Sequence, residues 1–195
     1  MSPDPIILNV GDLKQWVYCP RVVFYHRFAP NAGVPTAKMQ MALKAQQQLE
    51  PLEARRTLKP YGLDPAQRIF NPWLASDPLG LQGRPDLLLE AMDRIAIVDF
   101  KLTSGDAAPN LQMQLAAYSL IAEQVYQKPA PVGFIYRIPD SAVLPVPISP
   151  ELRQAVLDSA AAIRAMISSE SLPEPTDLRK RCDDCEFANF CADIW

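Results

Sequence analysis

The chain has 195 residues, of which 49% are hydrophobic, and its formal net charge is −3 at pH 7. These values favour one globular domain with a buried core, and no segment approaches the ~18 consecutive apolar residues of a membrane span. The first 30 residues lack a basic segment that leads into an apolar one and a small-residue cleavage site. We therefore expect a cytoplasmic protein that is neither secreted nor bound to a membrane.

An early helix is expected to begin near Thr36 and to end or kink at Pro51, because proline lacks a backbone donor. A short basic run follows at residues 55–59, and a second one stands at residues 179–181. Each run taken alone is typical of a solvated surface. Together they are the candidate contacts for an anionic partner of this acidic chain.

Two short apolar runs, at residues 87–89 and 95–98, are separated by a polar break and predict a β-hairpin. In any symmetric turn centred on that break, Asp86 pairs with Asp99. Their β-carbons would then lie roughly 4.5–5.5 Å apart, where like charges normally destabilise a sheet. Lys101, two residues beyond Asp99, shares the same face of the strand because side chains alternate.

Two carboxylates and an amine on one face of a partly buried hairpin form a candidate divalent-cation site. A lone Asp-x-Lys in a strand is usually a solvated face. Here, however, Asp86 converges on Asp99 and Lys101 from a separate strand, and unpaired charges are costly beside buried surface. The assignment depends on the register, because a slip of one residue would move the two aspartates to opposite faces.

Apolar residues recur at spacings of three and four between Leu111 and Val125, which predicts an amphipathic helix. Gln114 and Tyr118 are i,i+4 neighbours on one side of it; alone, such a pair is more often a core tyrosine beside a surface glutamine. With the strands before and after it, at residues 95–101 and 132–136, the helix predicts a right-handed strand–helix–strand unit with parallel strands. The start of the helix would lie at the strand end where open α/β sheets usually bind ligands.

The C-terminal part begins with a helix capped by Ser149 and leads to a cysteine group, Cys182, Cys185 and Cys191, while Cys19 stands near the start. In a reducing compartment this spacing favours metal ligands over disulfides. Zinc is the usual ion of a Cys-x-x-Cys pair, a four-thiolate iron–sulfur cluster is the second candidate, and a redox disulfide is the third. A site that used all four would join the two ends of the chain.

These motifs follow one another in a characteristic order: Cys19-Pro20-Arg21, Gly83-x-x-Asp86, Val98-Asp99-x-Lys101, Gln114-x-x-x-Tyr118 and the terminal Cys-x-x-Cys-x5-Cys. The combination resembles the RecB-type branch of the PD-(D/E)xK nucleases with an iron–sulfur clasp. Within that branch it is most similar to the small stand-alone CRISPR adaptation nucleases, the fourth Cas family. The resemblance extends over nearly the whole chain.

The resemblance implies an α/β fold of the PD-(D/E)xK, restriction-endonuclease-like type. Its mixed sheet would span about residues 68–148 and be flanked by helices, with the N- and C-terminal segments joined at a four-cysteine metal site. The whole chain, residues 1–195, would be a single nuclease domain. The nuclease core would cover about residues 36–170, and the clasp would consist of Cys19 and residues 180–195.

The resemblance also implies the residues that perform the chemistry, which is metal-dependent hydrolysis of DNA phosphodiesters. The catalytic set would be Asp86, Asp99, Lys101, Gln114 and Tyr118. Asp86, Asp99 and the Phe100 carbonyl would hold Mg²⁺ or Mn²⁺. In place of zinc, a [4Fe–4S] cluster would be bound by Cys19, Cys182, Cys185 and Cys191.

The implied substrate is the single-stranded end of a prespacer, a DNA fragment that becomes a CRISPR spacer. The implied partner is the CRISPR integrase complex, with which the nuclease would select the protospacer-adjacent motif. One departure stands out, because the family's early-helix histidine is replaced by glutamine at Gln46 or Gln47, and the single histidine is His26. Two alternatives stay open: a stand-alone RecB-like DNA repair nuclease, and a catalytically weak adaptation subunit that reads the motif, which the missing histidine favours.

Overall fold

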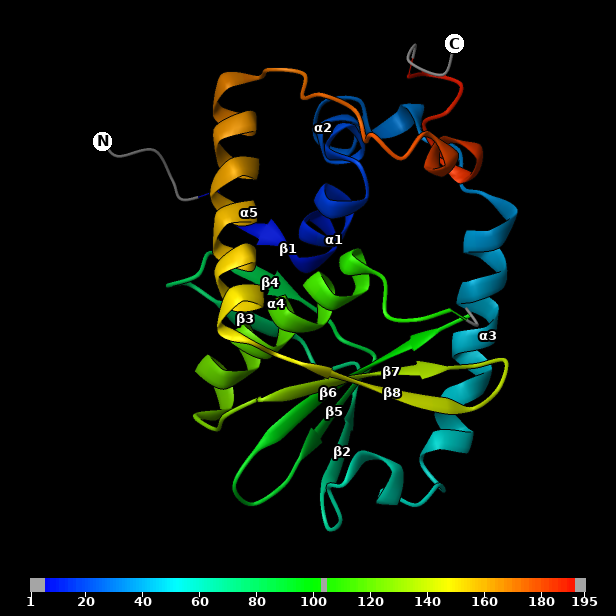
Figure 1. The fold of residues 1–195 in the computed structure, drawn as a ribbon, viewed down its shortest axis with the longest axis vertical. Helices are drawn as coiled ribbons and strands as arrows, with labels where there is room; N and C mark the ends of the chain where they lie inside the picture. Colours follow the sequence, from blue (N-terminus) through cyan, green and yellow to red (C-terminus); the bar gives the residue numbers. More distant parts are fainter. Residues whose placement is uncertain (1–5, 103–104, 192–195) are drawn as a thin grey trace.

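A mixed five-stranded sheet forms the centre of the computed structural model, which describes residues 6–102 and 105–191. The strand order is β2-β5-β6-β7-β8, with β6 and β7 parallel and the other neighbours antiparallel. This is the predicted mixed sheet, and Figure 1 shows it in the lower half of the molecule. The strands are β2 (Gln67–Phe70), β5 (Leu87–Glu90), β6 (Ile95–Lys101), β7 (Val132–Arg137) and β8 (Ala142–Pro147).

A second, smaller sheet lies beside the first and was not predicted. Its strands are β1 (Leu8–Asn9), β4 (Leu81–Gly83) and β3 (Leu74–Ser76), in that order, with β1 parallel to β4. Strands of two or three residues are too short to show a period of two, so the sequence pattern carries no signal for them. The sheet matters because β4 leads directly into the segment that holds Asp86.

The predicted strand–helix–strand unit is present, with α4 (Pro109–Tyr126) between the parallel strands β6 and β7. The predicted C-terminal helix is α5 (Pro150–Ser169), and Ser149 caps it by accepting a hydrogen bond at its Oγ from the Leu152 N–H at 3.2 Å. The early helix, α3 (Ala37–Glu53), continues past Pro51 instead of ending there. The helix ends two residues beyond Pro51, so this proline lies in its last turn.

Two short helices precede α3: α1 (Val10–Tyr18) and α2 (Pro20–Phe28). Three 3₁₀ turns complete the described part of the chain: η1 (Pro30–Ala32), η2 (Lys59–Tyr61) and η3 (Arg179–Asp184). Among the described residues, none of the helices combines the length and apolar character needed to cross a membrane.

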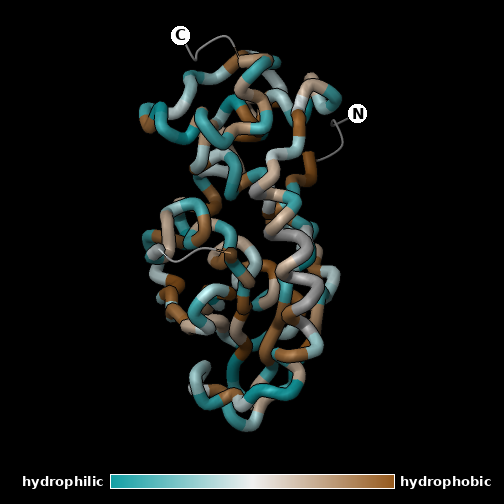
Figure 2. Tube along the Cα trace, turned by 90° about the vertical axis from the view of Figure 1, so that its right-hand side faces the viewer, coloured by the Kyte–Doolittle hydropathy of each residue, from teal (hydrophilic) through white to brown (hydrophobic). Residues whose placement is uncertain are grey.

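Alternate residues of the central strands pack on opposite faces of the sheet. One set joins the core formed with α1, α4 and α5, and the other joins Leu49 of α3 and Tyr61. Because both faces are covered, β5 and β6 are apolar along most of their length, which explains their uninterrupted hydrophobic runs. Figure 2 shows these hydrophobic segments in the middle of the molecule. The two sets include Leu88, Ile97 and Ile135 on the first face, and Leu87, Val98 and Phe134 on the second.

Candidate active site and four-cysteine pocket

The two aspartates lie beside each other at one end of the β5–β6 hairpin. Leu88 pairs with Ile97, which is the register predicted from the sequence. Asp86 lies just beyond the last pair of the ladder, and its Oδ2 accepts a hydrogen bond from the main-chain N–H of Phe100 at 2.7 Å. The symmetric turn therefore places the Asp86 carboxylate next to the residue that follows Asp99.

Lys101 completes this cluster from the same strand as Asp99. Asp99 is only 1% exposed, and its Oδ2 lies 2.5 Å from the Lys101 Nζ. Burial and the neighbouring Asp99 raise the pKa of Asp86 to about 7, although Lys101 and the Phe100 N–H act in the opposite direction. Burial favours the neutral form of Lys101, but the two carboxylates outweigh it and raise the pKa of this amine above its usual range.

Tyr118 reaches the cluster from α4, on the face of the sheet that carries Asp99, and Gln114 lies one helical turn before it. The Tyr118 hydroxyl donates to the main-chain carbonyl of Arg84 at 3.1 Å. Burial and the two aspartates raise the pKa of Tyr118, so it remains a hydroxyl at neutral pH. A Cβ on Gly83 would lie 2.9 Å from the Tyr118 ring, closer than real Cβ contacts, so glycine is needed here for close packing.

Gln114 supplies an acceptor that the protein itself does not use. Its Oε1 is buried and has no hydrogen-bond partner within residues 6–102 and 105–191. Buried polar atoms without a partner are rare and call for an explanation such as a bound water or ion. The position of this atom, one helical turn before Tyr118, is consistent with a bound group at the carboxylate pair.

Within the described residues, no three His, Cys, Asp or Glu side chains are grouped closely enough to hold a metal ion. The donor chemistry of Asp86 and Asp99 nevertheless fits Mg²⁺ or Mn²⁺, because these ions prefer oxygen ligands and retain several waters. The side chains of Gln46 and Gln47, on α3, lie outside the described part of the structure. His26 is not at this site, because its Nε2 lies 3.0 Å from the Glu186 Oε1 in the C-terminal segment.

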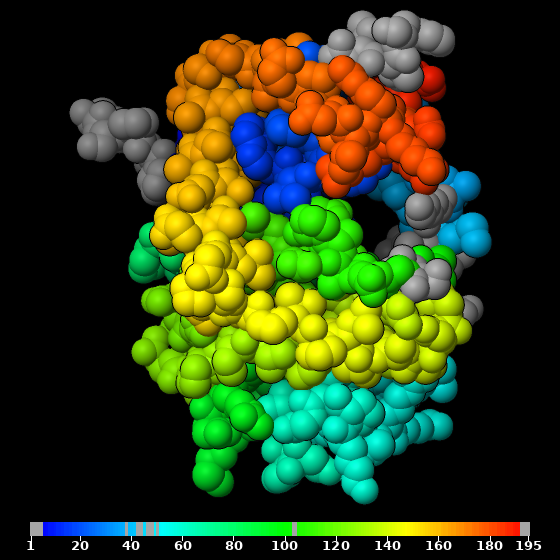
Figure 3. Space-filling view, viewed as in Figure 1, coloured from blue at the N-terminus to red at the C-terminus, as the bar shows by residue number. Residues whose placement is uncertain are grey.

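Sequence reasoning missed a second lysine, Lys14, on α1. Burial lowers the pKa of Lys14, Lys101 lowers it further, and Asp99 and Asp86 act in the opposite direction, so all these charges lie within electrostatic range. Lys14 and Lys101 line the same pocket of about 450 Å³. Figure 3 shows this hollow between the C-terminal segment in orange, α4 in green and the start of α3 in blue-cyan. A single lysine in a nine-residue helix carries no signal by itself.

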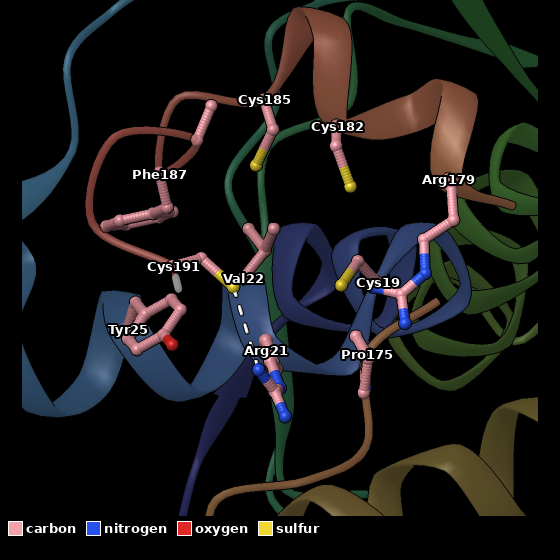
Figure 4. Close-up of a pocket in the computed structure, with 11 residues that line it drawn as sticks. Cys19, Arg21, Val22, Tyr25, Pro175, Arg179, Cys182, Cys185, Phe187 and Cys191 are labelled. Atoms are coloured by element: carbon pink, nitrogen blue, oxygen red, sulfur yellow. Dashed lines mark hydrogen bonds between the residues drawn. The ribbon is translucent and has the colours of Figure 1, made fainter. Parts of the chain in front are cut away.

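The four cysteines line one small pocket between the α1–α2 junction and the C-terminal segment (Figure 4). All four are free thiols, and burial raises the pKa of both Cys182 and Cys185, with the neighbouring cysteines adding to the effect. The Arg21 Nη1 donates to the Cys191 Sγ at 3.7 Å. The spacing of the cysteines thus predicted correctly that residues from both ends of the chain meet.

The C-terminal segment is also held by contacts that involve no cysteine. The Arg181 Nη1 donates to the main-chain carbonyls of Val17 at 2.9 Å and Tyr18 at 2.6 Å, and the Tyr18 hydroxyl donates to the Arg181 carbonyl at 2.7 Å. Phe187 is fully buried against Tyr25, with ring centroids 5.3 Å apart. Arg181 therefore has a structural role that the interpretation of residues 179–181 as a nucleic-acid contact did not foresee.

Arg56, in the other basic run, is likewise engaged inside the protein. Its Nη1 lies 3.4 Å from the Oε2 of the fully buried Glu53. Its guanidinium carbon lies 4.8 Å from the centroid of the Tyr136 ring. Part of each basic run therefore serves the fold. This reduces the positive charge that the protein alone can present to DNA.

Comparison with known proteins places this arrangement in a family. Residues 13–192 match the PD-(D/E)XK nuclease superfamily. The chain belongs to this superfamily, and the resemblance drawn from its motifs is confirmed. The carboxylate pair, the lysine and the α4 residues all lie within the matched range.

Within the superfamily, the chain is similar along nearly its whole length to two proteins named CRISPR-associated exonuclease Cas4. It is 28% identical over 193 residues to that of Francisella tularensis subsp. novicida (strain U112), covering 97% of this chain and 96% of the relative. It is also 28% identical over 189 residues to that of Aeropyrum pernix, covering 93% of each. A crystal structure of SSO0001 has the same fold, with a TM-score of 0.60 and 16% identity over 100% of this chain and 90% of the other.

Proposed function

We propose that this protein is a metal-dependent DNA exonuclease that trims the single-stranded ends of prespacers during CRISPR adaptation. The observation that supports it most is the largely buried cluster of Asp86, Asp99 and Lys101. The buried Gln114 Oε1, which has no hydrogen-bond partner within the described residues, adds to it. The printed names of the two Cas4 relatives support the exonuclease activity and the link to CRISPR. We further propose that the chain acts in the cytoplasm as one nuclease domain.

In this proposal Asp86, Asp99 and the Phe100 carbonyl hold Mg²⁺ or Mn²⁺. When bound there, the ion would act as a Lewis acid at the phosphate and lower the pKa of water. Burial and mutual repulsion make the metal-free carboxylate pair unfavourable, so a divalent cation relieves the repulsion.

Lys101 would position or activate the attacking water and stabilise charge. The two carboxylates raise the pKa of its amine and so favour the ammonium form. Next to Asp99 it can stabilise the negative charge that develops on the phosphate. Gln114 would orient the amine or the attacking water through its free acceptor, and Tyr118 would fix the segment carrying Asp86 through the Arg84 carbonyl.

We also propose that Cys19, Cys182, Cys185 and Cys191 bind a [4Fe–4S] cluster. All four thiols line one pocket between the two ends of the chain. The order of the cysteine motifs, which resembles that of nucleases with an iron–sulfur clasp, supports a cluster over a single zinc ion.

The acidic chain supports a partner-dependent nuclease. Its net charge is −3, and both Arg56 and Arg181 are engaged in contacts within the protein. Because affinity for DNA depends on the number of phosphates neutralised, the isolated protein should bind single strands weakly. The CRISPR integrase complex would supply the missing basic surface and present the protospacer-adjacent motif.

The proposal is tested by digestion of end-labelled single-stranded DNA with Mn²⁺, with EDTA as control, alone and with the integrase complex. Substrates with and without the motif should be trimmed weakly by the protein alone and selectively in the presence of the partner. Absence of cleavage together with motif-selective binding would favour the motif-reading subunit, which the missing early-helix histidine supports. Equal trimming of all ends, with or without the partner, would favour the stand-alone repair nuclease.

A further inference from the structure

The pocket beside the carboxylate cluster is lined by side chains of both charges. Lys14 lies on α1 and Lys101 on β6, and Asp184 and Glu186 line it from the C-terminal segment. Glu186 is paired with His26, with 3.0 Å between the Glu186 Oε1 and the His26 Nε2. A DNA backbone carries one negative charge per phosphate, so the two lysines are the groups of this pocket that attract it.

Lys14 differs from Lys101 and Lys128, which are also partly buried, in having no carboxylate within ion-pair distance among the described residues. Lys101 lies 2.5 Å from Asp99, and Lys128 lies 2.8 Å from Glu90, whereas Lys14 forms no ion pair with any residue in the described ranges. Asp99 and Asp86 act on Lys14 only from beyond ion-pair distance, so they compensate the burial of its ammonium group in part. A bound anion in the pocket would lower the remaining cost.

The fold holds Lys14 firmly in this place. Its neighbour Leu13 is fully buried in the main core, and α1 packs against α4, the helix that carries Gln114 and Tyr118. A lysine fixed on a packed helix loses less conformational freedom on binding than one on a loop.

We propose that Lys14 forms a second phosphate subsite, which binds the phosphodiester next to the one being cleaved. Lys101 acts at the scissile phosphate, and Lys14 sets the position of the strand by holding the neighbouring phosphate. Lys14 is therefore a positioning residue for single-stranded DNA. This inference rests on the proposed DNA-cleaving function and extends it to a second contact.

The test combines variants with chemically altered DNA. Single-stranded substrates carry one neutral methylphosphonate at successive positions around the cleavage site, and each is digested by wild-type protein, Lys14→Met and Lys14→Arg with Mn²⁺. Methionine keeps most of the apolar stem and removes the charge. Lys128→Met is the matched control, because it removes a partly buried lysine charge at the opposite end of β5, where that lysine pairs with Glu90.

We expect Lys14→Met to lower kcat/KM on unmodified DNA about 10- to 100-fold, as for a lost charged hydrogen bond, with Lys14→Arg recovering most of it and Lys128→Met near wild type. In a plot of the logarithm of the DNA-binding constant against the logarithm of the salt concentration, the slope should become shallower by about 0.7. This is the value for one neutralised phosphate on a single strand. One methylphosphonate position should slow the wild type by a similar factor. That same position should not slow Lys14→Met further.

The proposed subsite is refuted if the wild type cleaves DNA but the loss of kcat/KM from Lys14→Met and the loss from the methylphosphonate multiply at every position. Lys14 and that phosphate would then act independently. The subsite is also refuted if Lys14→Met cleaves as fast as wild type. A different result, no cleavage by wild type with any divalent ion, would refute the proposed nuclease function itself. The two failures are therefore distinguishable.

Discussion

The carboxylate cluster and the four-cysteine pocket are assembled in different ways. The first is built on two neighbouring strands, and its geometry is set by one hairpin register and by main-chain contacts such as the Phe100 N–H to Asp86. The second brings together residues more than 160 positions apart, such as Cys19 and Cys182, through side-chain contacts of the C-terminal segment. The geometry of the carboxylate cluster depends only on formation of the sheet. The geometry of the cysteine pocket depends on contact between the two ends of the chain.

The largest effect is expected at the cluster on the sheet. Asp99→Ala or Lys101→Ala should reduce Mn²⁺-dependent cleavage by at least about 1,000-fold, because each removes a group that we propose to act at the reacting phosphate. Asp93→Ala is the matched control, since Asp93 is exposed in the turn of the same hairpin. Circular dichroism should show the same fold for all variants. Wild-type cleavage rates in both Asp99→Ala and Lys101→Ala would remove the assigned site.

Substitutions in the cysteine pocket should lower the stability of the protein more than its rate of DNA cleavage. Anaerobically purified protein should be brown, with iron and sulfide in the ratio of a [4Fe–4S] cluster. Cys19→Ser and Cys185→Ser should then lower the melting temperature by similar amounts, because either variant opens the same closure between the ends. Both should have little effect in protein stripped of iron. Stoichiometric zinc without iron would contradict the cluster assignment and leave the nuclease site untouched.

A smaller effect is expected from Arg181, which joins the C-terminal segment of the cysteine pocket to α1. Arg181→Met should lower the free energy of unfolding by about 1–3 kcal/mol, because two main-chain carbonyls of α1 lose a charged donor. The exposed neighbour Lys180 is the control, and Lys180→Met should be near neutral. Denaturant titration measures both. If Arg181→Met weakens DNA binding at unchanged stability, residues 179–181 act as a nucleic-acid surface after all.

The smallest effect concerns the repulsion inside the cluster. Because the pKa of Asp86 is raised to about 7 in the folded state, the folded protein binds this proton more tightly than the unfolded chain. Metal-free stability from this group should therefore fall as the pH rises from about 4 to about 7. In EDTA at pH 8, the melting temperature of Asp86→Asn should lie a few degrees above that of the wild type, since a gain of 1 kcal/mol raises it by about 2–4 °C. At pH 4 the two melting temperatures should be equal. An equal pH profile for both proteins would exclude this repulsion.

The sequence predicted those features whose geometry follows from local pattern. The β5–β6 register followed from two apolar runs placed symmetrically about a polar break, and that symmetry alone locates Asp86 opposite Asp99. The helix carrying Gln114 and Tyr118 followed from apolar spacing. The roles of these residues in catalysis stay predictions.

The features that were missed depend on how elements pack. Lys14 reaches the site only because α1 packs on α4, which no pattern within α1 reveals. Arg181 has the sequence signature of a surface cation, yet it is bonded to α1 through the fold of the C-terminal segment. The strands of the smaller sheet are too short for any periodic signal. In each case the information lies in tertiary contacts between distant segments.

The contact between Gly83 and the Tyr118 ring offers a way to separate shape from chemistry in this enzyme. The segment that carries Asp86 packs closely against the Tyr118 ring, and a Cβ at Gly83 would lie 2.9 Å from a ring carbon. Gly83→Ala would remove no ionisable group, but it would push the segment that carries Asp86 away from the Tyr118 ring. The residual cleavage activity of this variant would measure how much of catalysis depends on the alignment of the site residues alone.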